Sequence, residues 1–171
     1  REGHRRLYEH LRSSVPHWPE GIAGLQPLYQ AVVHGCAAGC TVDAHRNVYW
    51  ARICRAARFY STRQLGAISA DLAAVACFFE HIWDTPSNAL DIADRSWMLG
   101  MAAFALRSLG RLRDALGPVR ADLYLRVQLE DWENAAIAAG NLSELELTLG
   151  QTSAAIESGT KGVEYADRSE K

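Results

Sequence analysis

One octet recurs three times along the chain, and its residues are those that end one helix and begin the next. It reads Leu-Gly, four variable residues, a small or short residue and a branched apolar one, and its copies begin at Leu65, Leu109 and Leu149. Glycine ends a helix because it reaches positive φ without a Cβ clash, and a small residue lets two helices approach closely. The octet therefore predicts helical hairpins that turn at glycines 66, 110 and 150.

The segments on either side of these glycines have the apolar spacing of amphipathic helices. The pattern before Gly110 consists of Trp97, Met101, Phe104 and Leu106, and the pattern after it of Leu112, Leu116, Val119 and Leu123. The 171 residues include five prolines, so long stretches contain no helix breaker. Alanine, leucine and arginine dominate these stretches and favour helix. The sequence predicts an all-α chain.

The octets divide the chain into about four helical pairs within a single repeat domain spanning 1–171. Irregular N-terminal helices are expected within 1–40, at about 5–14 and 22–38. Hairpins follow over 41–83, 88–128 and 131–168, and the first of them consists of helices at 41–64 and 66–83. An alternative places Gly66 inside one helix that begins near residue 62, which would make the number of helices odd.

Polar residues mark the starts of the later helices. Thr85 precedes Pro86 and is therefore biased toward extended backbone, so a loop is expected there. Ser87 or Asn88 can cap the next helix, and Asp131 can cap the helix that begins at Trp132. The chain begins with an arginine and ends in a charged segment without a polar capping repeat, which is typical of a piece of a longer protein.

With these residues in view, the chain resembles the tetratricopeptide repeat family, whose hairpin turn carries a glycine followed five positions later by a small residue. The repeat of about 40 residues resembles the long-period repeats of bacterial signalling proteins of the STAND and NACHT type. The segments PLYQAVVHGCAAG, VYWARI, FYSTRQLGAISADLAA and NAAIAAGNLSELELTLG also resemble the helical regions of such proteins. The resemblance covers residues 22–168 and implies a right-handed α-α superhelix that acts as a non-catalytic, protein- or peptide-binding scaffold or sensor.

The resemblance also implies a concave groove lined by the first helix of each pair. The positions that match are Tyr60, Arg63, Gln64, Trp97, Phe104, Arg107, Asn141, Glu144 and Thr148. Trp97 and Phe104 are equally well explained as core residues. Asn141 and Arg107 are favoured as binding residues because a partly buried amide or guanidinium needs polar partners.

Metal and catalytic chemistry are not indicated. His34, Cys36, Cys40 and His45 lie within twelve residues, but the histidines do not share the helix face of the two cysteines, so packed cysteines are favoured over a zinc site. The cluster of Cys77, Glu80 and His81 has a helical spacing that arises often by chance, and no glycine loop for phosphate is present. We therefore expect no enzyme, no metal and no cofactor.

Charge is distributed unevenly along the chain. The strongest basic cluster contains no acid between Asp43 and Asp71 and consists of Arg46, Arg52, Arg55, Arg58 and Arg63. We interpret it as a solvated face or a site for an acidic peptide, because the net charge of −2 and the lack of stacking aromatics disfavour nucleic acid. Glu144 and Glu146 are also interpreted as solvated helix surface, and Glu146 most clearly so.

The partner expected from these features is a protein or peptide whose identity the sequence does not define. Self-association, or packing on adjacent repeats, is the alternative, and exposed Val163 and Tyr165 would favour it. A nucleic-acid-binding repeat and a small helical enzyme are the less favoured hypotheses. The chain has no apolar run near the ~18 residues of a membrane span and no secretory signal, and its four cysteines fit free thiols, so a cytoplasmic protein is expected.

Overall fold

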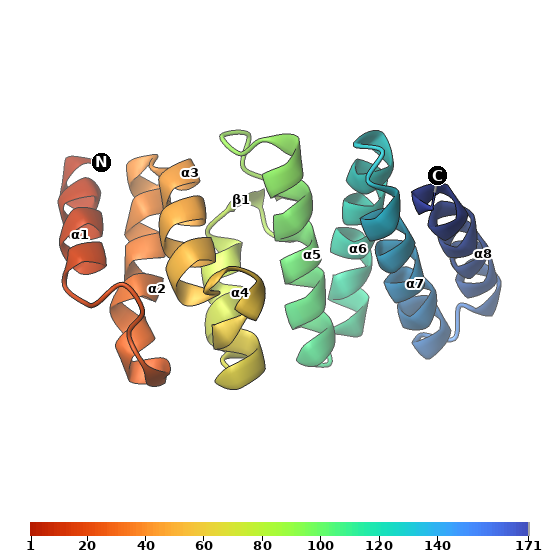
Figure 1. The fold of residues 1–171 in the computed structure, drawn as a ribbon, viewed down its shortest axis with the longest axis horizontal. Coiled ribbons are helices and arrows are strands. Elements are labelled where there is room, and N and C mark those ends of the chain that lie inside the picture. Colours follow the sequence, from red (N-terminus) through yellow and green to blue (C-terminus); the bar gives the residue numbers. More distant parts are fainter. Residues whose placement is uncertain (171) are drawn as a thin grey trace. The chain divides into compact units, whose positions relative to one another are not determined.

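The computed structural model describes residues 1–170, and most of them are helical, which confirms the predicted all-α class (Figure 1). Their contacts divide the chain into two compact units, Arg1–Glu80 (unit 1) and His81–Lys171 (unit 2). Within residues 1–170, no helix combines the length and the apolar character needed to cross a lipid bilayer.

Unit 1 begins with two helices that pack against each other, α1 (Glu2–Ser13) and α2 (Gly21–Ala38). Gly39 ends α2 with a φ of 82°, a conformation that glycine adopts without strain. The chain then continues through a series of short elements, which are α3 (Thr41–Asp43), the π-helical η1 (Ala44–Ile53), the 3₁₀ turn η2 (Ala56–Arg58), the π-helical η3 (Tyr60–Gln64) and α4 (Ile68–Ala76).

The prediction of one helix over 41–64 is wrong, because the chain breaks between η1 and η3. Arg55, Ala56 and Phe59 all have positive φ, between 47° and 55°, and residues in this conformation cannot continue a right-handed helix. The cause lies in two arginine side chains. Arg52 and Arg55 turn inward and bind backbone carbonyls of the segment between α1 and α2, instead of remaining on a solvated helix face.

The helix predicted over 66–83 is also shorter than expected. It ends at Ala76 and is followed by β1 (Phe79–His81), which pairs with β2 (Thr85–Pro86). The extended backbone that Pro86 imposes on Thr85 suits a strand. Trp83 turns the chain between the two strands with a φ of 65°.

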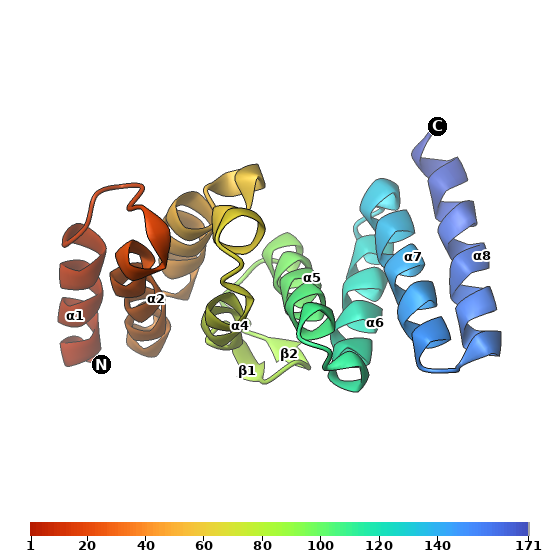
Figure 2. The same cartoon turned by 90° about the horizontal axis from the view of Figure 1, so that it is seen from below.

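Unit 2 consists mainly of four helices of similar length, each packed against the next (Figure 2). They are α5 (Ile92–Ser108), α6 (Leu112–Gln128), α7 (Trp132–Thr148) and α8 (Thr152–Ser169). Asp131 caps α7 as predicted, since its carboxylate accepts from the backbone N–H of Asn134. The cap of α5 is Asp91 rather than Ser87 or Asn88, because the helix begins later than expected.

The three glycines of the repeated octet lie in turns with positive φ, as predicted. Their φ values are 62° at Gly66, 73° at Gly110 and 78° at Gly150. Gly66 lies between η3 and α4, so the alternative that placed it inside one helix is wrong. The small residue of the octet is buried in every copy, as Asp71, Ala115 and Ala155.

The turn between α6 and α7 differs from its neighbours because Glu130 occupies its left-handed position, with a φ of 55°. Glu130→Gly should therefore stabilise unit 2 by about 1 kcal/mol, since glycine reaches this conformation without a Cβ clash. Urea denaturation provides the measurement. Gln128→Gly serves as the control, because it places a glycine inside helix α6. This variant should lose up to about 1 kcal/mol of stability. A loss of stability in both variants would contradict this account of the turn.

Candidate functional site

A groove of about 440 Å³ lies between α5 and α7 in unit 2, next to the start of α6. Its lining residues are Phe104, Arg107, Ser108, Leu112, Asn141, Glu144, Leu145 and Thr148. Five of the nine residues predicted to bind a partner are among them, namely Phe104, Arg107, Asn141, Glu144 and Thr148. The structure thus brings together the predicted residues of two successive hairpins.

Helical spacing explains why these side chains converge. On α5, Arg107 and Ser108 follow Phe104 by three and four positions. On α7, the other three groove residues follow Asn141 by three, four and seven positions. Residues with this spacing share one side of a helix. The groove is therefore made by one face of α5 and the facing side of α7.

Arg107 spans the groove from one wall to the other. Its Nη1 donates to Oδ1 of Asn141 over 2.9 Å, and its Nη2 donates to Oε2 of Glu144 over 2.6 Å. The Glu144 side chain is 70% exposed, so this ion pair contributes little to stability. Its main consequence is geometric, because it holds a flexible guanidinium in one place. The Nδ2 group of Asn141 carries two further donors that can face a ligand.

Phe104 supplies the apolar part of the groove. Its side chain is 46% exposed, so the alternative that made it a core residue is wrong. The buried Leu145 lies among the lining residues, and Ile137, 58% exposed, stands one turn before Asn141 on α7. A narrow hollow of about 90 Å³ shares Phe104 and Arg107 with the groove. Apolar surface therefore lies beside fixed polar groups.

The remaining predicted groove residues are placed differently. Trp97 is half-buried on α5 and does not line the groove. Tyr60, Arg63 and Gln64 belong to unit 1. Tyr60 is 5% exposed and donates its hydroxyl to Glu20, so its ring is packed inside the unit. Arg63 and Gln64 are exposed.

Three groove residues were not predicted. Ser108 and Leu112 flank the turn at Gly110, and Leu145 follows Glu144. The signal that could have found Leu145 is its position four residues after Asn141, which places both on the same side of α7. Ser108 similarly lies four residues after Phe104.

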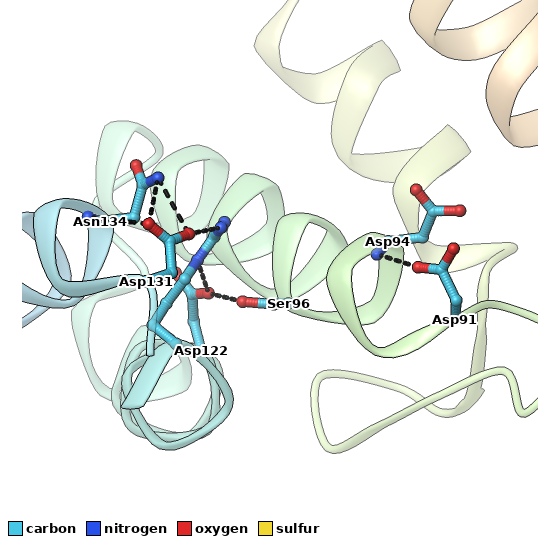
Figure 3. Close-up of polar contacts among 7 residues, drawn as sticks. Asp91, Asp94, Ser96, Asp122, Asp131 and Asn134 are labelled. Carbon is cyan, nitrogen blue, oxygen red and sulfur yellow. Dashed lines mark hydrogen bonds and ion pairs between the residues drawn. The ribbon is translucent and has the colours of Figure 1, made fainter. Parts of the chain in front are cut away.

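In unit 2, the Arg126 side chain donates hydrogen bonds to two carboxylates, those of Asp122 and Asp131, whose pKa values are shifted in opposite directions (Figure 3). Asp122 accepts from Oγ of Ser96 at 2.5 Å and from Nε of Arg126 at 3.1 Å, and Nη1 of Arg126 donates to Asp131 at 2.8 Å. Burial raises the pKa of Asp122 above its usual range. Burial acts in the same direction on Asp131, but hydrogen bonds from Asn134 and Arg126 outweigh it and leave the pKa of Asp131 lowered.

These two carboxylates should give opposite pH dependences of stability. The raised pKa of Asp122 means that its stabilising contribution is complete below the unfolded pKa of about 3.9 and is lost as pH rises through the folded value. The lowered pKa of Asp131 means that its contribution is present above about pH 3.9 and is lost as pH falls through the folded value.

The stability advantage of the wild type over Asp122→Asn should therefore be largest near pH 4 and shrink toward neutral pH. Its advantage over Asp131→Asn should be largest at neutral pH and shrink in acid. Urea denaturation over a series of pH values provides the measurement. If both stability advantages grew, or both shrank, as the pH is raised, the environments assigned to Asp122 and Asp131 would be contradicted.

Glu146 does not lie on a solvated face, and its prediction as solvated surface is wrong. It is 2% exposed and accepts from Nη2 of Arg120 on α6 at 2.8 Å and from Oγ of Ser158 on α8 at 2.7 Å. The face of α7 that carries it is covered by the helices on both sides. Glu144, two residues earlier, is exposed as predicted.

The residues considered for metal binding and catalysis have other surroundings. In the part of the chain that the structure describes, no group of three or more histidine, cysteine or acidic residues is arranged to hold a metal ion. Nδ1 of His34 lies 2.8 Å from Nδ1 of His4. All four cysteines carry free thiols, and burial raises the pKa of Cys36 and Cys77, so these thiols are protonated and weakly nucleophilic at neutral pH.

Comparison of the chain with protein-family models, with curated proteins and with solved structures gives no match. The feature that bears on function is therefore the groove between α5 and α7, where an exposed aromatic ring, a fixed guanidinium and an amide lie together.

Proposed function

We propose that the chain is a non-catalytic binding module whose groove in unit 2 receives a segment of a protein or peptide. The observation that carries this proposal is the placement of Phe104 and Arg107 on one wall and Asn141 on the other. Aromatic and arginine side chains dominate the binding energy of protein interfaces when they are held in place before the partner arrives. Arg107 meets that condition through its bonds to Asn141 and Glu144.

The same proposal includes the larger architecture expected from the sequence. We place the helices in a right-handed, tetratricopeptide-like superhelix of about four hairpins, which serves as a scaffold or sensor region in a signalling protein of the cytoplasm. The glycine turns at 66, 110 and 150 and the consecutive packing of α5 to α8 support this architecture. The free thiols are consistent with the location.

Removing the two groove anchors should weaken binding without unfolding the chain. Peptides selected from a random dodecapeptide library on the immobilised chain serve as probes, and fluorescence anisotropy measures their affinity. Arg107→Ala combined with Asn141→Ala should weaken binding at least about tenfold, because each substitution removes hydrogen-bond donors from the groove. Helical content measured by circular dichroism should stay unchanged, because neither side chain is fully buried.

A matched control changes the same number of side chains outside the groove. Arg113 and Gln151 are exposed residues of unit 2 that do not line it. Arg113→Ala with Gln151→Ala should leave the affinity unchanged. Peptides that bind both double variants as well as the wild type would refute the groove as the binding site.

Self-association is the second candidate, and exposed apolar residues on α8 favour it. Ile156 and Val163 are 67% and 64% exposed and lie seven positions apart, so they share one side of the helix. Tyr165 does not add to this face in the way expected, because its ring stacks on Trp132. A mass that rises with concentration in sedimentation, and that Ile156→Glu with Val163→Glu returns to the monomer value, would favour this function.

A further inference from the structure

Unit 1 carries a cluster of aromatic rings and arginines around the break between η1 and η3, in which Trp18, Arg58 and Arg63 are exposed and the other two members are half-buried. We call it the arginine–aromatic surface, and it consists of Trp18, Trp50, Arg58, Phe59 and Arg63. The guanidinium of Arg58 lies 5.4 Å from the centre of the Trp18 ring, and that of Arg63 lies 4.8 Å from the centre of the Phe59 ring. Trp50 contacts Phe59 edge to face, and Trp18 is fixed by a bond from its indole N–H to the carbonyl of Ala51.

The arginines of this segment divide into two kinds. Arg52 and Arg55 are buried and donate hydrogen bonds to other groups of unit 1. Arg58 and Arg63 are exposed, and within residues 1–170 neither has a carboxylate at ion-pair distance. The acid at this site, Glu20, is occupied by Arg55 and by the hydroxyl of Tyr60.

Stacking on an aromatic ring prepares an arginine to bind an oxyanion. The ring occupies the flat face of the guanidinium, which restricts the side chain, and the N–H groups at its edge stay available. A guanidinium in this state can bind a carboxylate through two parallel hydrogen bonds with little further loss of entropy. Arg58 and Arg63 each have the guanidinium carbon over an aromatic ring, within the distance of a cation–π interaction.

The backbone beneath the surface is strained. Three residues without the freedom of glycine, Arg55, Ala56 and Phe59, adopt positive φ within five positions. Such conformations persist only where the surrounding structure fixes them, and they concentrate at ligand-binding sites. The π-helical segments η1 and η3 on either side are a further feature often found at functional sites.

We propose that the arginine–aromatic surface is a second binding site, separate from the groove in unit 2, and that it takes an acidic peptide segment. Charge complementarity identifies the partner, because two unpaired guanidinium groups face solvent. A nucleic acid fits less well. The guanidinium groups cover one face of the Trp18 and Phe59 rings, so these faces cannot stack on bases, and the chain has a net charge of −2.

The test uses the full chain and a fluorescein-labelled peptide of eight glutamates, with fluorescence anisotropy at low ionic strength. The wild type should bind this peptide and should bind it less tightly as salt is added, since exposed charges are screened. Arg58→Gln with Arg63→Gln should weaken binding about tenfold, through loss of the charge-assisted hydrogen bonds. The variant removes two exposed side chains, and circular dichroism should show native helix content.

Three controls make the proposal falsifiable. Arg5→Gln with Arg113→Gln removes the same charge from exposed arginines elsewhere and should leave the affinity within about twofold, because only the general field changes. The Arg107→Ala, Asn141→Ala variant should bind the glutamate peptide like the wild type. A peptide of eight glutamines should not bind.

The proposal is overturned if the glutamate peptide does not bind, or if it binds the Arg58, Arg63 variant as tightly as the wild type. Equal losses in the Arg5, Arg113 control would show a non-specific charge effect and would also overturn it. A single-stranded oligothymidine that binds more tightly than the glutamate peptide, and depends on Arg58 and Arg63, would assign the surface to nucleic acid instead.

Discussion

Asp71→Ala should destabilise unit 1 by about 4 kcal/mol, because it leaves buried hydroxyl groups without their acceptor. The Asp71 carboxylate is fully buried and accepts from Tyr29 at 2.5 Å, from Tyr49 at 3.1 Å and from Ser61 at 2.9 Å. These donors come from α2, η1 and η3, so one side chain of α4 joins three other elements. A buried donor that loses its partner costs about 1–3 kcal/mol, and the small cavity left by the carboxylate adds to this cost.

Hydrogen exchange measured by mass spectrometry is the suitable test, because it reports on unit 1 separately. Peptides from α2 and α4 should exchange faster in the variant, while peptides from α7 should keep their protection. Asp71→Asn keeps one acceptor oxygen and should cost less than alanine. Asp167→Ala, at an exposed position of α8, is the control for removing an aspartate and should have no effect on unit 1. A loss below about 1 kcal/mol in Asp71→Ala would contradict the role assigned to the carboxylate.

Arg52→Leu should destabilise unit 1 by about 3 kcal/mol, because it removes a guanidinium that binds four backbone carbonyls. The Nε group donates to His17, Nη1 donates to Arg12, and Nη2 donates to Val15 and Pro16. Three of these carbonyls belong to the connection between α1 and α2, and the fourth, that of Arg12, lies in the last turn of α1. The substitution should therefore release that connection first.

Exchange of the amides between residues 13 and 21 should rise more in Arg52→Leu than exchange within α2. Arg52→Lys should behave almost like leucine, since one ammonium group cannot reach carbonyls spread over six residues. Arg58→Leu, six residues later in the same basic cluster, should change stability by less than about 0.5 kcal/mol, because Arg58 is exposed. Equal losses at the two arginines would contradict the division of the cluster into buried and exposed members.

The parts of the structure that the sequence predicted depend on local patterns. Each glycine of the octet needs positive φ wherever it stands, so the turns at Gly66, Gly110 and Gly150 were predicted from neighbouring residues alone. The helices of unit 2 follow from apolar spacing. Arg107 and Asn141 were predicted from their match to the tetratricopeptide pattern, and the structure has them on facing sides of α5 and α7. For this reason the candidate site in unit 2 was largely predictable.

The parts that the sequence did not predict depend on residues far apart in the chain. Arg52 is buried because carbonyls 35 to 40 residues earlier lie within its reach, and periodicity cannot distinguish it from Arg58. Glu144 and Glu146 differ in the same way, because α6 and α8 together cover only the face that carries Glu146. Asp71 stands where the other two octets have alanine, but its three hydroxyl partners come from other elements.

The pairing of Glu146 has a consequence for any attempt to lengthen the protein by copying its last hairpin. In a chain where α7 and α8 are followed by duplicates of themselves, the copied Glu146 would face α8 instead of α6. The octet alignment places Thr160 of α8 at the position of Arg120, so the duplicate would bury a carboxylate with no cation to neutralise it. The hairpins are therefore not interchangeable. A chain with a duplicated hairpin would need arginine at position 160, or an apolar residue in place of the copied Glu146.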